Sequence, residues 1–226
     1  MTTMNIDSYE EIRDRLMIRL MDLSSNEEKL ENVIWEPAGC GFALAAYMEI
    51  PDEAGENGVA NVPRAVAHAL GIEERTIMQD AMEGSASHVP AKLSTMRSAL
   101  FGPPENLLAE KEKKPLEGTD FLVLTTEDGR LGASALCYPE MTRRLGEIVG
   151  GDYFVLPSSV HEVLFLPDRG NLSPNDLLLM VMEVNEAEVL PEDRLADRVM
   201  HFRTDLQKLQ VAAEPGRDRD RGEERG

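Results

Sequence analysis

The spacing of apolar residues predicts a helix at the start of the chain and a pair of strands after it. Residues 7–23 carry apolar side chains on one helical stripe and two glutamates in the first turn, as an amphipathic helix does. Residues 33–35 and 42–50 read as strands on either side of a turn, and residues 51–58 read as an acidic loop. The turn contains Gly39-Cys40-Gly41, which lacks the third glycine and the following helix of a dinucleotide-binding loop. We therefore interpret it as a simple glycine turn.

The middle of the chain predicts two short helices and then an exposed connection. Residues 63–70 and 73–82 have helical periodicity and are separated at Gly71. Residues 102–118 are rich in Pro, Glu and Lys and read as a connection into the second half of the chain.

A β-hairpin is predicted directly after this connection. Residues 121–126 and 131–137 have strand patterns and are separated by Asp128-Gly129, the dipeptide that favours a type I′ turn. In the expected register, Leu122, Leu124 and Ala133 are buried.

The second half predicts further helices packed on a sheet. Residues 177–184 are apolar nearly all round, which is typical of a helix that is buried centrally or covered by a partner. Residues 139–149 read as a helix, and residues 153–156 and 163–166 read as strands. The apolar helix is expected to begin at Ser173 and Pro174. After it, residues 191–197 read as a turn, residues 199–209 as a last strand and residues 214–226 as a disordered tail. The fold class expected is α+β, with a mixed, mostly antiparallel sheet, packed helices and a preceding helical segment. The expected organisation is an N-terminal α+β segment 1–101, a linker 102–118, an α+β core 119–212 and a tail 213–226.

Chemically capable side chains crowd together between the two predicted strands of the second half. Ser158, Ser159, His161 and Glu162 are the residue types of a serine nucleophile, its base and an orienting carboxylate. The same residues also fit a capping box, in which Ser159 and Glu162 cap a single helical turn that joins the strands. A zinc-protease motif is not formed, because Phe165 stands where its second histidine would be. We favour the capping hypothesis, and no motif in the chain indicates a cofactor or a metal.

Several stretches resemble a known family. They read LPSSVHEV, preceded by VPRAVAHALGIEERTIMQDAMEG and FLVLTTEDGRLGASALCYPEM and followed by NDLLLMVMEVNEAEVLPEDRLADRVMHF. Over roughly residues 62–209 the chain resembles an uncharacterised bacterial family, the domain-of-unknown-function family 5688. The resemblance implies a shared fold and a soluble intracellular setting. Because the family has no assigned activity, the resemblance assigns no catalytic residue, and it makes Ser158, Ser159, His161 and Glu162 the positions to test first.

Charge and composition narrow the classes of function. The net charge is −19, and the first 62 residues carry thirteen acidic and four basic side chains. Because nucleic-acid-binding surfaces depend on clustered Lys and Arg, direct nucleic-acid binding is not expected. Cys40 and Cys137 lack a metal-binding or redox spacing, and the sequence shows neither a secretion signal nor a long apolar run, so we expect a cytoplasmic protein outside the membrane.

Three hypotheses of function follow. The first is a non-catalytic acidic binding or accessory protein with a protein partner. The second is an acidic inhibitor that mimics nucleic acid and occupies a basic protein such as a defence nuclease. The third is a hydrolase that uses Ser158 or Ser159 with His161 and Glu162. The partner, any ligand and the oligomeric state are left open by the sequence.

Overall fold

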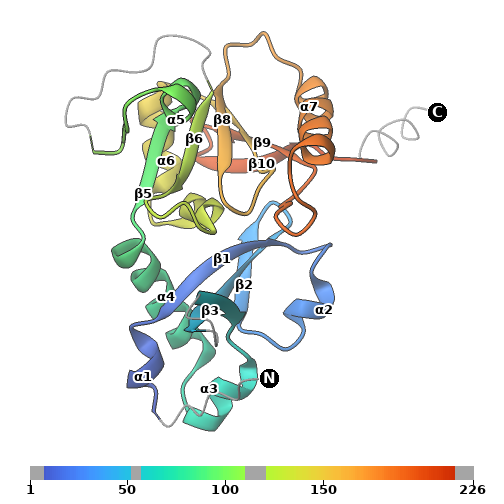
Figure 1. Ribbon diagram of the computed structural model, residues 1–226. Coiled ribbons are helices and arrows are strands. Elements are labelled where there is room, and N and C mark those ends of the chain that lie inside the picture. Colours follow the sequence, from blue (N-terminus) through green and yellow to red (C-terminus); the bar gives the residue numbers. More distant parts are fainter. Residues whose placement is uncertain (1–7, 52–56, 110–120, 217–226) are drawn as a thin grey trace. The chain divides into compact units, whose positions relative to one another are not determined.

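The chain divides into two compact units. The computed structural model describes residues 8–51, 57–109 and 121–216, and it separates an N-terminal unit, Met1–Pro90, from a C-terminal unit, Ala91–Gly226 (Figure 1). Each unit combines helices with antiparallel strands, which confirms the α+β class. The predicted segment 1–101 crosses the boundary, because residues 91–101 belong to the second unit.

The N-terminal unit is built on a four-stranded antiparallel sheet. Strand β3 lies at its centre and pairs with β1, β2 and β4. The elements in chain order are α1 (Glu10–Arg13), β1 (Leu16–Asp22), α2 (Glu27–Leu30), β2 (Trp35–Gly39), β3 (Phe42–Pro51), β4 (Asn57–Asn61), α3 (Arg64–Leu70) and α4 (Glu74–His88). The Gly39-Cys40-Gly41 segment is the turn between β2 and β3, and all three residues have positive φ.

The helix predicted over residues 7–23 is wrong beyond its first turn. Helix α1 ends at Arg13, and β1 pairs with β3 from Leu16 opposite Met48 to Asp22 opposite Phe42. Every residue of β1 except Arg19 is buried, so the strand has apolar side chains on both faces. A strand buried on both faces loses the alternation that would distinguish it from a helix.

Helix α4 protects the outer edge of β1. The Ile18 backbone N–H donates to the Ser85 hydroxyl at 2.7 Å, which satisfies a donor that an edge strand would leave unpaired. Gly84 makes this approach possible, because a Cβ there would collide with the Leu16 carbonyl oxygen. Helix α4 therefore covers this edge of the sheet in place of a neighbouring strand.

The C-terminal unit is built on a six-stranded antiparallel sheet with the order β10-β9-β7-β8-β6-β5. The elements in chain order are β5 (Ala91–Thr95), α5 (Met96–Phe101), β6 (Leu122–Thr126), the 3₁₀ helix η1 (Gly132–Cys137), α6 (Met141–Val149), β7 (Tyr153–Leu156), β8 (Val163–Pro167), α7 (Pro174–Ala187), β9 (Val199–Arg203) and β10 (Lys208–Ala213).

Alternate residues of the strands pack against helices on the two faces of this sheet. On one face, Tyr153 stacks on Phe202 with ring centroids 4.9 Å apart, and its hydroxyl donates to the Thr142 carbonyl of α6. On the other face, Phe154 and Leu156 belong to a cluster with the buried side of α7. That side is formed by Leu177, Leu178 and Val181.

The opposite side of α7 is exposed. Leu179 is 65% exposed, and Met182 and Val184, on the flanks of the helix, are 37% and 38% exposed. The helix that the sequence predicts as apolar nearly all round is therefore packed on its sheet along one side only.

The predicted hairpin of residues 121–126 and 131–137 is wrong in its second strand. Strand β6 forms, but β5 and β8 occupy its two edges, and residues 132–137 form η1 instead. Gly129 has a φ of +70°, whereas Asp128 does not have positive φ, so the turn is not type I′. The expected burial is confirmed, because Leu122, Leu124 and Ala133 are fully buried.

The last strand is also different from its prediction. Residues 199–209 are not one strand, because β9 and β10 form an antiparallel hairpin around residues 204–207.

The structure confirms several of the other predicted elements. They are the α3–α4 pair broken at Gly71, helix α6, strands β7 and β8, and helix α7 beginning at Pro174. Residues 52–56 of the predicted acidic loop, 110–118 of the predicted linker and 217–226 of the predicted tail lie outside the described residues.

Candidate functional site

The loop of residues 157–162 joins β7 to β8 and contains all four sequence-predicted site residues. No helical turn forms there, so the capping-box prediction is wrong. Instead, the Ser159 hydroxyl accepts a hydrogen bond from the His161 backbone N–H at 3.0 Å, a local serine turn, and Ser159 forms an isolated β-bridge with Arg194.

Backbone hydrogen bonds fasten this loop on both sides. One set reaches residues 193–196, and the other reaches η1. The bonds run from Ala196 N–H to Pro157 C=O, from Leu195 N–H to Ser158 C=O, from Val160 N–H to Asp193 C=O and from Ala133 N–H to Val160 C=O, at 2.8–3.1 Å. The loop is thus a junction between three segments of the unit.

The imidazole of His161 has both nitrogens engaged. Its Nδ1 lies 3.2 Å from the Leu131 backbone N–H, which can only donate, so Nδ1 accepts and the ring proton lies on Nε2. Nε2 lies 3.2 Å from Asp193 Oδ1 and donates to it. A general base needs a free lone pair directed at the serine hydroxyl, and in this arrangement His161 has none to offer.

The structure therefore brings the four residues together in one loop without forming the contacts of a catalytic unit. The Ser159 hydroxyl is used by the backbone, and the Ser158 side chain is buried against apolar side chains. Within the part of the chain that the structure describes, Glu162 makes no hydrogen bond or ion pair with its side chain. The residue that orients His161 is Asp193, which the sequence analysis missed because it lies 32 positions away.

Gly132 sets the tight packing beneath this loop. A Cβ at this position would overlap the Thr125 hydroxyl, the His161 carbonyl oxygen and the Thr126 backbone nitrogen. The Thr125 hydroxyl in turn donates to the His161 carbonyl at 2.8 Å. Only a residue without a side chain fits between them.

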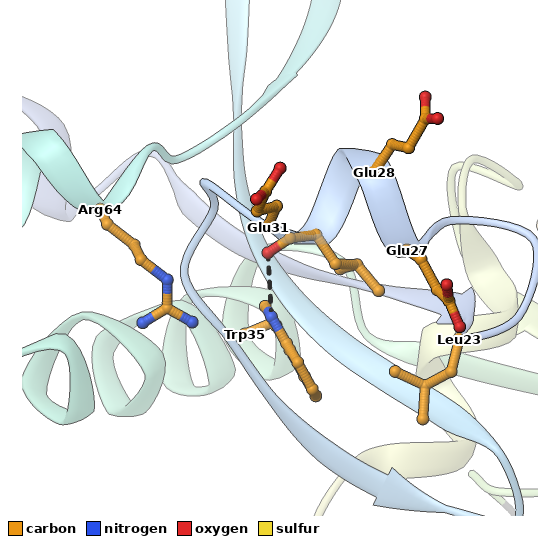
Figure 2. Close-up of a pocket in the computed structure, with 7 residues that line it drawn as sticks. Leu23, Glu27, Glu28, Glu31, Trp35 and Arg64 are labelled. Atoms are coloured by element: carbon orange, nitrogen blue, oxygen red, sulfur yellow. Dashed lines mark hydrogen bonds between the residues drawn. The ribbon is translucent and has the colours of Figure 1, made fainter.

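A second candidate site lies in the N-terminal unit. The N-terminal unit contains a hollow of about 490 Å³, which we call the Trp35 hollow. Its lining residues come from the position just after β1, from α2 and the residue after it, from β2 and from the start of α3 (Figure 2). They are Leu23, Glu27, Glu28, Leu30, Glu31, Trp35 and Arg64.

Local sequence chemistry places α2 at the rim of this hollow. The Asp22 carboxylate accepts from the Ser24 hydroxyl and from the Ser25 backbone N–H, which turns the chain into the helix. Leu30 then anchors α2, because it is buried against Met21 and other residues of the sheet.

Trp35 is fixed from the same helix. Its indole Nε1 donates to the Leu30 carbonyl at 3.1 Å, so the ring is held while part of it remains accessible. Figure 2 shows the Trp35 side chain between Arg64 and the glutamates of α2. Arg64 itself is paired with Glu74.

The glutamates carry negative charge that the described chain does not neutralise. Glu27, Glu28 and Glu31 are exposed, and their side chains form no ion pair or hydrogen bond with any described residue. Glu27 and Glu31 are four residues apart, a spacing at which like charges destabilise a helix by about 0.2–0.5 kcal/mol. An aromatic wall beside carboxylates is the arrangement that attracts an ammonium or guanidinium group.

The sequence analysis missed this hollow. The sequence signal that could have indicated it is the single tryptophan of the chain, which follows three closely spaced glutamates and lies four residues after the last of them. Arg64 could not be assigned to it from the sequence. Among the described residues, no group of three or more His, Cys, Asp or Glu could hold a metal ion.

Together, the fold and the hollow define a two-unit α+β protein with an acidic, aromatic-walled recess. The chain belongs to a family of unknown function, DUF5688, whose sequence profile matches residues 1–204. This confirms the predicted family and extends the match to the N-terminal residues that carry the Trp35 hollow. No curated protein and no solved structure matches the chain. In the described ranges, no helix is long and apolar enough to span a membrane.

Proposed function

We propose that this protein is a non-catalytic, acidic, cytoplasmic binding protein, and that its Trp35 hollow receives a Lys or Arg side chain of a basic protein partner. The observation that carries the proposal is the presence of three unneutralised glutamates and a fixed indole in one recess. Cations bind over the face of tryptophan, and carboxylates at the rim add hydrogen bonds to the bound charge.

The charge of the whole chain supports a basic partner. A net charge of −19 attracts a positively charged surface and raises its rate of association. The same charge disfavours direct nucleic-acid binding. A partner that itself binds nucleic acid would make this protein an acidic mimic of a phosphate backbone, which is the narrower form of the proposal.

The geometry of the loop of residues 157–162 supports a non-catalytic role. Both ring nitrogens of His161 are used to hold Leu131 and Asp193, and among the hydrogen bonds of the described residues none joins a serine hydroxyl of this loop to the ring. We therefore expect a serine-reactive phosphonate to label neither Ser158 nor Ser159. Stoichiometric labelling that is lost in His161→Ala would contradict the proposal and favour the hydrolase.

Affinity capture from the native host with matched variants tests the proposal. The bait variant Glu27→Gln/Glu28→Gln/Glu31→Gln removes the three negative charges of the hollow and keeps Arg64. The control Glu183→Gln/Glu186→Gln/Glu188→Gln removes the same charge from exposed positions of α7 and its end. We expect mass spectrometry to identify a basic protein with the wild type and the control and to find it depleted with the hollow variant. Equal capture by both variants, or no basic protein with the wild type, would overturn the proposal.

A further inference from the structure

The outer edge of β2 is an open strand edge beside the Trp35 hollow. Strand β2 pairs with β3 on one side, and no other described strand pairs with its second side. Four of its five residues, Glu36 to Gly39, are exposed. The opposite edge of the sheet, at β1, is covered by α4 instead. An exposed strand edge is a template on which an extended segment of another chain can pair.

Alternation along β2 decides which backbone groups point outward. The Ala46 N–H of β3 donates to the Ile34 carbonyl at 2.9 Å, so Ile34 faces β3. Trp35 and Ala45 are therefore a non-hydrogen-bonded pair, and the backbone groups of Trp35 and Pro37 point away from β3. None of these groups has a hydrogen-bond partner among the residues that the structure describes. The edge thus offers the Trp35 N–H as a donor and two carbonyls as acceptors.

The composition of this edge favours a basic segment of another protein over a second copy of this chain. Pro37 has no N–H, and proline on an exposed edge protects it from pairing with itself. Glu36 is exposed on β2, and three glutamates line the hollow beside it. Two copies would bring these like charges together, whereas a segment that carries Lys or Arg is attracted to them.

Strand addition would place one side chain of such a segment beside the indole. In an antiparallel arrangement, the residue opposite Trp35 exchanges two backbone hydrogen bonds with it, and the two Cα atoms lie about 5.5 Å apart. Residues that are directly opposite project their side chains from the same face of the sheet. The Trp35 side chain lies on the face that carries α2, because its indole Nε1 donates to the Leu30 carbonyl. The residue opposite Trp35 therefore directs its side chain to the hollow.

We propose that the partner contributes an extended basic segment that adds to the outer edge of β2 as an antiparallel strand, with the Lys or Arg that enters the hollow directly opposite Trp35. The inference rests on the proposed function and adds how the partner is held. Main-chain hydrogen bonds to the edge fix the register of the segment, and the hollow selects the charged side chain. The basic residue of the partner accordingly lies in an extended stretch and not in a helix.

Peptides that differ by one backbone methyl group test the pairing. The probe is acetyl-Thr-Thr-Arg-Thr-Thr-amide, whose threonines favour an extended backbone, and calorimetric titration of the whole chain measures its affinity. Methylation of the arginine nitrogen removes the N–H that donates to the Trp35 carbonyl. The matched control carries the methyl group on the next nitrogen, whose N–H points away from β2. We expect about tenfold weaker binding for the first peptide, and for the control an affinity within about twofold of the unmodified probe.

Amide hydrogen exchange provides a second readout, on the protein itself. The outward Trp35 N–H gains a partner when the strand is added, whereas the Glu36 N–H faces β3 with or without the peptide. We expect saturating peptide to slow exchange at Trp35 about tenfold and to leave exchange at Glu36 unchanged.

The possible failures separate the two proposals. Equal affinities of the two methylated peptides, or an unchanged exchange rate at Trp35 under saturation, would overturn strand addition while cation binding in the hollow still stood. No binding of the unmodified peptide up to its solubility limit would overturn both the strand addition and the proposed function.

Discussion

The loop of residues 157–162 and the Trp35 hollow both gather polar side chains, but the two regions use them differently. In the loop, the His161 ring and the Ser159 hydroxyl form hydrogen bonds to other parts of the chain. In the hollow, the glutamates of α2 form none with the described residues, and the indole is fixed with part of its surface accessible. Polar groups that are already paired stabilise the fold, whereas unpaired ones are available to a partner. The loop of residues 157–162 carries the residue types of a serine catalytic site, yet it is the region whose polar groups stabilise the fold.

The largest effect is expected at Gly132, where the loop packs on β6. Gly132→Ala forces a Cβ into the Thr125 hydroxyl and two backbone atoms, so we expect a loss of about 3 kcal/mol in the free energy of unfolding, measured with urea. The control is Gly129→Ala, where an added Cβ meets nothing within 4 Å and only the positive φ is strained. We expect this control to lose about 1 kcal/mol. Similar losses in the two variants would show that the loop is not tightly packed on Gly132.

A smaller effect is expected when the His161 bridge is removed. His161→Ala leaves the Leu131 N–H and the Asp193 carboxylate without their ring partner, and we expect unfolding to become easier by about 1–2 kcal/mol. His161→Asn places an oxygen near the position of Nδ1 and should recover part of this loss. If both variants unfold like the wild type, the ring has no structural role and the comparison between the two regions fails.

Within the described residues, the carboxylate of Asp152 is hydrogen-bonded, unlike the carboxylates of the hollow. The Thr204 hydroxyl donates to it and lowers the pKa of Asp152, with further help from the Thr204 backbone N–H and from nearby basic side chains. Because the folded-state pKa lies below the unfolded value of about 3.9, the ionised carboxylate stabilises the fold above about pH 4. This contribution is lost as the pH falls through the folded-state pKa.

Asp152→Asn should therefore lower the free energy of unfolding at pH 7 by about 1 kcal/mol and by less at pH 3. Urea unfolding at the two pH values measures the difference, and Asp176→Asn, at an exposed position of α7, is the control. A loss of equal size at both pH values would contradict the assigned role of the ionised carboxylate.

The smallest effect is expected in the hollow itself. Glu31→Gln removes the repulsion between Glu27 and Glu31 and breaks no contact with a described residue, so stability should stay unchanged or rise by about 0.2–0.5 kcal/mol. A clear loss of stability on urea unfolding would show that this carboxylate serves the fold, which would remove the distinction between the two regions.

Sequence patterns correctly predicted the elements that bury apolar side chains on one face only. Helix α6 has a single buried stripe, and the α3–α4 pair is broken by a glycine at φ +65°. The patterns failed at β1, which is buried on both faces, and at residues 132–137, where a strand was expected although β5 and β8 already occupy both edges of β6. Strand order is a property of the whole sheet, and the local pattern does not contain it.

The candidate site was less predictable than the fold. The cluster Ser158 to Glu162 could be located from the sequence, but its contacts depend on Leu131 and Asp193, which are distant along the chain. The Trp35 hollow brings Arg64 beside α2 through an isolated bridge between Val33 and Pro63. Such long-range contacts leave no periodic signal in the sequence.

Fluorescence of Trp35 tests the central claim most directly, because it is the only tryptophan of the chain and forms one wall of the hollow. The probe is a short arginine-rich peptide, and its citrulline counterpart keeps the shape and loses the charge. The account predicts a saturable change in Trp35 emission with the arginine peptide alone. It also predicts affinity about tenfold weaker in Glu27→Gln/Glu28→Gln/Glu31→Gln and within about twofold of wild type in the α7 control. An emission change that is equal for both peptides, or equally weakened by both triple variants, would contradict a cation-binding role for the hollow.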